Sequence, residues 1–170
     1  MPLRSSFSDL DAEYAATRSM LAAVPWDRAD WAPHDASMTL GTLARHVATL
    51  PRFGLAALTS DTMDARALRV PPDPVSAADD LVAIWDDASG ALRDALADAS
   101  DDALGQPWTM TMNDGAVTLV EGSRAEVVRR WTLSHIAHHR GQLSVYLRLL
   151  DVPVPGAYGP SADDLAAMNR

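Results

Sequence analysis

The sequence predicts an all-α protein: a four-helix bundle with a long crossover between helices two and three and a small β-hairpin before helix four. Four long stretches repeat apolar residues at the spacing of an α-helix. The turn-forming triplet at 113–115, Asn-Asp-Gly, separates two short segments rich in β-forming residues. With 170 residues and a 48% hydrophobic content, the chain fits a single domain over 1–170 with a sizeable core.

The first two helices are bounded by recognisable start and stop residues. The first is expected to begin at Ser8, a suitable N-cap followed by acidic residues, and to stop at Pro25. The second is expected to run from Thr39 to about Leu58. Because a proline lacks the backbone donor, we expect a kink or a local break at Pro51 inside this helix.

The third helix follows a stiff, proline-rich linker at 70–74, whose length suggests a crossover rather than a tight turn. Ser76 and Asp79 resemble a capping pair, and the apolar spacing then continues to Leu96. A hairpin is expected from the segments 108–112 and 117–120.

The fourth predicted helix is the longest. Ser123 and Glu126 have the spacing of a capping box, in which each side chain bonds the backbone of the other residue. The helix is expected to run from Arg124 to about Leu150, where a proline-rich segment follows.

Composition excludes several classes of protein. No cysteine is present, which excludes disulfides, cysteine metal sites and a cysteine nucleophile. All 14 basic residues are arginine, so lysine-based chemistry is also absent. A net charge of −9 disfavours nucleic acid as a partner. Neither a signal core nor a long apolar run is present, so we expect a cytoplasmic protein without a membrane partner.

Three of the five histidines fall within one short stretch of the fourth predicted helix. At about 100° per residue, His135 and His139 lie one turn apart on the same face, and His138 lies near that face. Two imidazoles at positions i and i+4 form a common metal clamp on a helix. The stretch therefore indicates a metal site, with a set of structural histidines as the alternative.

The other two histidines differ in their surroundings. His46 lies on the apolar face of the second predicted helix, where an imidazole without a partner would be costly. Alone it would be interpreted as a hydrogen-bonded core residue. Together with the cluster on a facing helix, it favours a site of three histidines. His34 lies in a predicted loop and is interpreted as a surface or helix-entry residue.

The scarcity of glutamate limits the type of metal site. Only three glutamates occur, and none belongs to the Glu-x-x-His pairs of ferritin-like di-metal bundles. Ile136 stands where zinc peptidases with a His-Glu-x-x-His motif have their glutamate, so that class is not predicted. Three neutral nitrogen ligands suit Zn²⁺, Ni²⁺ or Fe²⁺ and leave positions open for water or substrate.

These residues resemble those of the DinB (damage-inducible) family. The most specific part is the run His-Ile-Ala-His-His-Arg-Gly-Gln-Leu at 135–143, with His46 upstream. The runs Tyr-Leu-Arg-Leu-Leu at 146–150, Val-Pro-Val-Pro at 152–155 and Tyr-Gly-Pro-Ser at 158–161 extend the resemblance, which covers essentially the whole chain.

The resemblance implies a four-helix bundle, often a homodimer, with a divalent metal (Zn, Ni or Fe) held by three histidines. By position these are His46, His135 and His139, and His138 would be their neighbour. Some relatives look like S-transferases or isomerases that use a low-molecular-weight thiol such as mycothiol or bacillithiol, while many have no assigned reaction. The family name records induction by DNA damage and implies no binding to DNA.

One mechanistic hypothesis and two alternatives follow. In the hypothesis the metal holds a thiol cosubstrate as thiolate, which attacks a small-molecule electrophile. Because the chain has no cysteine, the thiol must come from the cosubstrate. The alternatives are metal-assisted hydrolysis by bound water, for which the sequence offers no obvious glutamate base, and a non-catalytic metal- or ligand-binding protein of the stress response.

Three residues near the cluster have further expected roles. Arg140 is expected either to steer an anionic cosubstrate or to form a structural ion pair. Gln142 is expected to orient a ligand histidine through a hydrogen bond. Gly141 is expected to allow two helices to approach closely.

Overall fold

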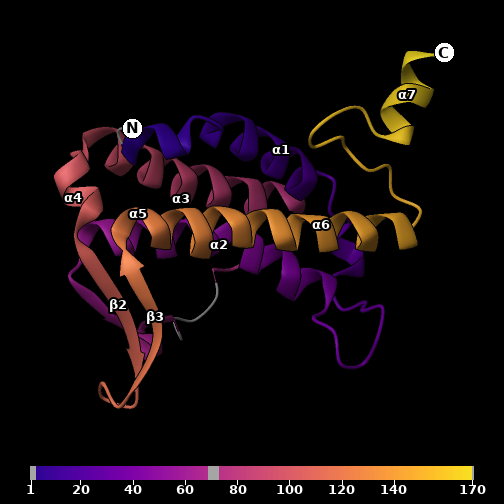
Figure 1. The fold of residues 1–170 in the computed structure, drawn as a ribbon. Helices are drawn as coiled ribbons and strands as arrows, with labels where there is room; N and C mark the ends of the chain where they lie inside the picture. The colour runs from indigo at the N-terminus through magenta and orange to yellow at the C-terminus, as the bar shows by residue number, and fades with distance from the viewer. Residues whose placement is uncertain (1–2, 69–72, 170) are drawn as a thin grey trace.

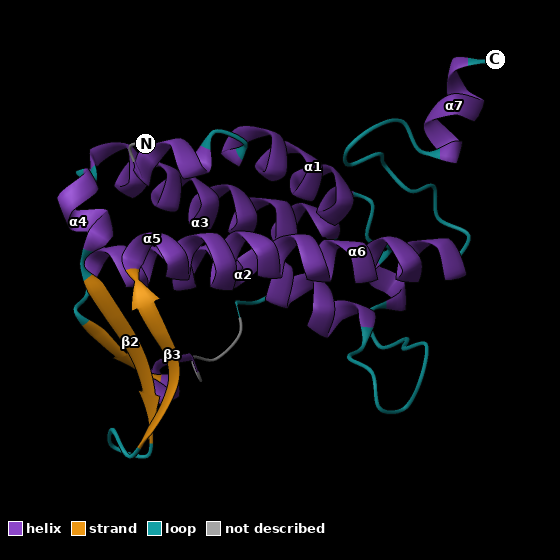
Figure 2. Cartoon of the chain, in the orientation of Figure 1, coloured by secondary structure: helices purple, strands orange, loops and turns teal. Residues whose placement is uncertain are grey.

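The computed structural model describes residues 3–68 and 73–169, which are mostly helical with a small three-stranded sheet (Figures 1 and 2). The longer elements are α1 (Leu10–Ala22), α2 (Leu40–Thr59), α3 (Ala78–Asp98), β2 (Pro107–Met112), β3 (Val117–Ser123) and the consecutive segments α5 (Arg124–Glu126), η4 (Val127–Leu133) and α6 (Ser134–Leu149). The shorter elements are η1 (Leu3–Phe7), η2 (Trp26–Arg28), β1 (Thr62–Asp64), η3 (Ala65–Leu68), α4 (Asp101–Gly105) and α7 (Ala162–Met168).

Four helices, α1, α2, α3 and α6, lie side by side and enclose the core (Figure 1). Helices α1 and α2 each contact both α3 and α6. Each helix contributes apolar side chains that are fully buried, among them Leu21, Leu43, Leu92 and Leu143. Burial of these apolar faces is the main source of their stability, because isolated helices of this length are marginal in water. No helix in the described part of the chain has the length and apolarity needed to cross a membrane.

Helix α2 begins where the sequence predicts. The Thr39 hydroxyl caps it by accepting a hydrogen bond from the Thr42 backbone N–H at 3.2 Å. The helix is continuous through Pro51, so the expected local break is absent there. A proline removes one backbone hydrogen bond, and the packing of α2 against α3 and α6 outweighs that loss.

The start of α1 differs from the prediction. The helix begins at Leu10 rather than directly after Ser8, and a short 3₁₀ turn, η1, precedes it. Asp9 occupies the N-cap position but makes no side-chain capping bond. Its carboxylate instead accepts a hydrogen bond from Arg129 at 2.8 Å, which ties the N-terminal turn to η4.

The cap of α3 is shifted by one residue from the expected one. The carboxylate that bonds Ser76 belongs to Asp80, not Asp79. It accepts hydrogen bonds from the backbone N–H and hydroxyl of Ser76, both at 2.7 Å, and from the backbone N–H of Ala77 at 3.1 Å. Since α3 begins at Ala78, Asp80 is the residue of the first turn that can reach these groups.

The predicted hairpin is present as β2 and β3, which pair antiparallel. Its turn contains three residues with positive φ: 56° at Asn113, 54° at Asp114 and 88° at Gly115. Asparagine, aspartate and glycine tolerate this left-handed region best, which is why the triplet predicts the turn. The hairpin projects from one end of the packed helices (Figure 2).

The crossover between α2 and α3 contains a strand that the sequence does not reveal. Strand β1 pairs parallel with β2, with Thr62 opposite Thr109, and makes the sheet three-stranded in the order β1-β2-β3. Three residues are too few to show a period-two pattern, so β1 is defined by its partner rather than by its own sequence. Of the proline-rich linker expected at 70–74, residues 70–72 lie outside the described residues.

The fourth predicted helix forms one helical run from Arg124 to Leu149. The predicted capping box is confirmed: Ser123 Oγ accepts from the Glu126 N–H at 3.3 Å, and the Glu126 carboxylate accepts from the Ser123 N–H at 2.8 Å. Its middle part, η4, is a π-helix, in which the Ser134 N–H bonds the carbonyl of Arg129, five residues earlier. Such turns occur frequently at functional sites, and this one ends just before the histidine cluster.

The chain after α6 forms an arm that ends in α7, and α7 itself lies away from the packed helices (Figure 1). Ser161 caps α7 by accepting from the Asp164 N–H at 3.0 Å. Asp163 joins the arm to α6 through an ion pair with Arg148 at 2.6 Å. No residue of α7 is buried.

Candidate metal centre

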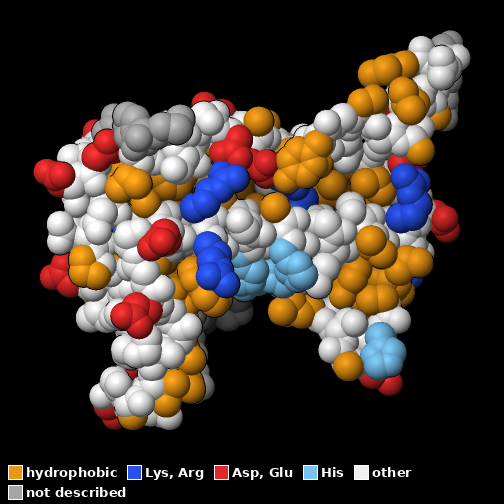
Figure 3. All heavy atoms as spheres, in the orientation of Figure 1, with side chains coloured by type: hydrophobic (Ala, Val, Ile, Leu, Met, Phe, Trp, Pro, Cys, Tyr) orange, Lys and Arg blue, Asp and Glu red, His pale blue; other side chains and the backbone are white. Residues whose placement is uncertain are grey.

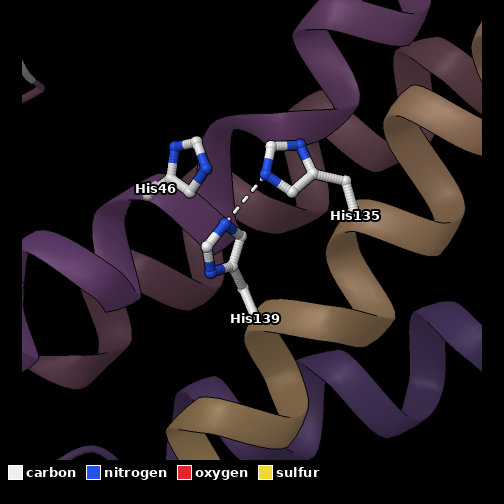
Figure 4. A group of neighbouring side chains, drawn as sticks. All are labelled: His46, His135 and His139. Carbon is white, nitrogen blue, oxygen red and sulfur yellow. Dashed lines mark hydrogen bonds between the residues drawn. The ribbon is translucent and has the colours of Figure 1, made fainter.

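Three histidines from two helices converge at the seam between α2 and α6 (Figure 4). His46 comes from α2, while His135 and His139 come from α6, one turn apart as their spacing predicts. One ring nitrogen of each lies within 4.8 Å of the others. Among the described residues, these three histidines are the group of potential metal ligands that lie close enough together to hold one ion.

His139 is held in place by Gln142. Its ring is buried, and its Nδ1 lies 2.7 Å from Oε1 of Gln142, one turn later on α6. An amide oxygen only accepts hydrogen bonds, so Nδ1 carries the proton and Nε2 carries a lone pair. The expectation that Gln142 orients one of the three histidines through a hydrogen bond is confirmed.

His135 lies one turn before His139 on α6 and contacts it directly. Its Nε2 faces Nε2 of His139 at 2.8 Å (Figure 4).

The short contact between the two Nε2 atoms is a hydrogen bond in the structure (Figure 4). Because Nδ1 of His139 carries its proton, Nε2 of His139 is the acceptor and Nε2 of His135 the donor; a cation that replaces this proton would find two nitrogen lone pairs. Burial, and then the nearby His139, lowers the pKa of His135, which favours the neutral ring. The donor set therefore fits a metal cation.

His46 completes the triangle. Its ring centroid lies 5.1 Å from that of His135 and 4.7 Å from that of His139. Burial and the two neighbouring histidines lower its pKa to about 4, so the ring is neutral at pH 7. A neutral imidazole is the form that binds a metal. Three imidazole nitrogens with no carboxylate among them match the preferences of Zn²⁺, Ni²⁺ or Fe²⁺.

The remaining two histidines lie outside the triangle. His138 is exposed, and its ring contacts that of His139 at a centroid distance of 4.9 Å. His34 is exposed in the loop before α2, where its Nδ1 accepts a hydrogen bond from the Ala36 N–H at 3.0 Å. The interpretation of His34 as a surface residue is therefore confirmed.

Arg140 is buried in an ion pair rather than directed toward the histidines. Its Nη2 lies 2.7 Å from the carboxylate of Glu13 on α1, and its Nη1 donates to Thr17 Oγ1 at 3.0 Å. Of the two expected roles, the structure shows the structural ion pair. Sequence inspection does not find Glu13 as the partner, because the two residues are 127 positions apart.

The expected role of Gly141 is wrong. A Cβ atom added there would meet nothing within 4 Å, because the residue lies on the exposed side of α6. The close approach of helices occurs instead at Gly54 of α2, where an added Cβ would lie 3.0 Å from Thr132 Oγ1 of η4.

The three histidines of the triangle differ in exposure: His46 and His135 are partly exposed, and His139 is buried. Figure 3 shows histidine side chains at the edge of a hollow between two projecting segments, the β2–β3 hairpin and the loop before α2.

The fold and this triangle can be compared with known proteins. The family model of the DinB superfamily matches residues 9–143, a span that includes all three histidines. The chain belongs to the DinB superfamily. This DinB protein thus has its histidine triangle inside the matched region, while the arm with α7 lies beyond it. A comparison with curated proteins gives no match.

Three solved structures have the same fold. A DinB-like protein from Bacillus subtilis has a TM-score of 0.64 at 15% identity, covering 88% of this chain and 95% of that one. A DinB-like protein from Bacillus cereus has a TM-score of 0.66 at 21% identity, covering 90% and 95%. A protein assigned to the DinB family from Exiguobacterium sibiricum has a TM-score of 0.65 at 22% identity, covering 96% and 98%. At these identities the comparison establishes the fold.

Proposed function

We propose that this DinB protein is a metal-dependent enzyme that activates a low-molecular-weight thiol, whose sulfur then bonds to a small electrophile. The observation that supports the metal part is the convergence of one ring nitrogen each from His46, His135 and His139 within 4.8 Å of one another. The thiol part is supported by the family resemblance of the 135–143 run and by an open, all-nitrogen donor set.

Each residue of the site has a definable task. His46, His135 and His139 would hold the cation, and Gln142 keeps Nε2 of His139 directed toward it. A divalent cation bound there would lower the pKa of a thiol and supply it as thiolate at neutral pH. The chain has no cysteine, so no side chain of the protein competes with the cosubstrate for this role.

The proposed transfer balances without a redox partner. The thiol releases its proton to solvent, and a sulfur electron pair forms the new bond to the electrophilic carbon. The bond from that carbon to its leaving group breaks, and the electron pair departs with the leaving group. We propose that both reactants enter through the hollow at whose edge histidine side chains lie (Figure 3).

Binding and turnover separate this proposal from its alternatives. We expect a low-molecular-weight thiol to raise the melting temperature of the metal-loaded protein and not of the chelator-treated protein, because a ligand stabilises only the state it binds. We also expect consumption of an alkyl or aryl halide to require that thiol. Turnover without thiol would instead show metal-assisted hydrolysis. If the thiol neither stabilises the metal-loaded protein nor is consumed, the remaining interpretation is a non-catalytic metal-binding protein.

The proposal includes the expected assembly of the protein. We regard the contacting helices α1, α2, α3 and α6 as a four-helix bundle in one domain over 1–170. We further propose a cytoplasmic homodimer with a role in the stress response, as the family resemblance implies. Light scattering of the purified protein tests the dimer, and a mass of about one chain, 18.2 kDa, would contradict it.

A further inference from the structure

The three imidazoles differ in what holds them. His139 donates its Nδ1 proton to Gln142 at 2.7 Å, and its Nε2 is hydrogen-bonded to Nε2 of His135 at 2.8 Å. All three side chains belong to α6. For the imidazole of His46, the described residues provide ring contacts with His135 and His139 but no hydrogen bond.

This difference has a consequence for metal binding. A hydrogen bond to the distal ring nitrogen fixes the tautomer and the orientation of a metal-binding histidine and raises its basicity. An imidazole without such a bond must lose rotational freedom about its side-chain bonds when it binds. It also donates less electron density to the cation.

The position of the histidines in the chain also distinguishes His46 from the other two. His135 and His139 are one turn apart on a single helix, so their separation is fixed by helix geometry. His46 stands on α2, and its distance from the pair depends on how α2 packs against α6. A small change at the seam would move His46 while leaving the pair intact.

We infer that the three histidines are inequivalent: His135 and His139, one turn apart on α6 with His139 held by Gln142, form a permanent two-nitrogen clamp, and His46 is the exchangeable ligand. The inference rests on the metal centre of the proposed function. An incoming anionic sulfur or oxygen donor would take the place of His46 more readily than that of either clamp residue. Gln142 is accordingly a positioning residue, which acts through His139.

The test is a competition titration with Zn²⁺ and a chromophoric chelator, in the absence of thiol and electrophile. We expect His135→Ala and His139→Ala each to weaken Zn²⁺ binding at least about ten-fold more than His46→Ala does. His138→Ala is the matched control, because it removes an imidazole that contacts the cluster from outside the triangle. It should leave the affinity unchanged.

Variants of Gln142 test the positioning role. Gln142→Leu removes the acceptor at similar size and should weaken Zn²⁺ binding by about 10–100-fold, the usual cost of losing such a partner. Gln142→Glu keeps an acceptor at the same place and should retain the affinity. Gln142 is exposed, so neither change disturbs the core, and circular dichroism of each variant verifies the helical content.

The outcomes are distinguishable. Equal losses from His46→Ala and His139→Ala, or wild-type affinity in Gln142→Leu, would overturn the inference and leave the proposed function standing. If the expected ranking is found but no thiol is consumed, the proposed enzyme activity fails and the inference stands. If the wild-type chain itself binds no Zn²⁺, Ni²⁺ or Fe²⁺, both fail.

Discussion

Arg140 and Glu13 form a buried ion pair that joins α6 to α1, with 2.7 Å between Nη2 and the carboxylate. The side chains are only 3% and 13% exposed. Tyr158 from the C-terminal arm covers the pair: its hydroxyl accepts from Arg140 at 2.6 Å and donates to Glu13 at 3.2 Å. Arg140 directly follows His139 in the sequence, so this pair anchors the helix that carries two of the three histidines.

Removal of one partner of this pair should destabilise the fold strongly. Arg140→Met leaves the Glu13 carboxylate buried without its cation, and the expected loss is about 3–5 kcal/mol in the free energy of unfolding. Urea denaturation of the metal-free protein measures it. A loss below about 1 kcal/mol would show that Glu13 finds water or another partner, and that the pair does not anchor α6.

The control for this change is Arg18→Ala. Arg18 also pairs with a carboxylate, that of Asp86 at 2.9 Å, but the two side chains are 52% and 46% exposed. Exposed ion pairs contribute about 0–1 kcal/mol. The two variants remove the same type of interaction and differ in burial. The difference between their losses in the free energy of unfolding therefore measures how much burial adds to the effect of losing the pair.

The seam between α2 and η4 should not tolerate a larger residue at position 54. A Cβ atom at Gly54 would lie 2.9 Å from Leu92 Cδ2 and 3.0 Å from Thr132 Oγ1. Gly54→Ala should therefore cost about 1–3 kcal/mol of stability through overpacking. The matched control is Gly90→Ala in α3, where an added Cβ meets nothing within 4 Å.

The control should change stability in the opposite direction. In Gly90→Ala the loss of backbone freedom in the unfolded chain should stabilise the protein by about 0.4–1 kcal/mol. Both variants are measured by the same denaturation experiment. If Gly54→Ala also stabilises the protein, α2 and η4 do not approach as closely as the structure shows.

The helix caps predict how stability depends on pH. Hydrogen bonds from Ser76 and Ala77 lower the pKa of Asp80, and those from Ser123 lower the pKa of Glu126. A carboxyl group with a lower pKa in the folded state binds fewer protons there than in the unfolded chain. Its stabilisation is therefore complete above the ordinary values of 3.8 and 4.5 and is lost as the pH falls through the folded values.

Substitution of a capping carboxylate tests this dependence. Asp80→Asn should lower the free energy of unfolding at pH 7 and should lose less stability than the wild type between pH 5 and pH 3. Asp79→Asn removes the same charge from the same turn without touching the bonds to Ser76 and serves as the control. Identical pH profiles for the wild type and Asp80→Asn would refute the capping role.

Features with a local chemical cause could be predicted from the sequence. The hairpin turn follows from the preference of Asn113, Asp114 and Gly115 for positive φ, and the cap at Ser123 follows from its spacing to Glu126. Helical geometry places His135 and His139 on one face without any knowledge of the fold. The same geometry brings Gln142 to His139, three residues earlier on α6, whereas the contact with His46 follows only once α2 is known to face α6.

Features set by packing could not be predicted. Strand β1 depends on its partner β2, and the pair of Arg140 with Glu13 joins positions 127 residues apart. Gly54 and Gly141 look alike in the sequence, and only the approach of η4 to α2 distinguishes them. The π-helix η4 is likewise invisible in a pattern of apolar residues, since it changes the helical turn within an otherwise continuous run.

The metal content of the purified protein tests the central claim most directly. The wild-type chain, His46→Ala and His139→Ala are loaded with a divalent metal, dialysed against a weak chelator and examined by elemental analysis. We predict about one bound ion per chain for the wild type, less in His46→Ala, and least in His139→Ala, because each change removes one of three nitrogens that converge within 4.8 Å. Full metal content in both variants would contradict the claim that these histidines form a metal centre.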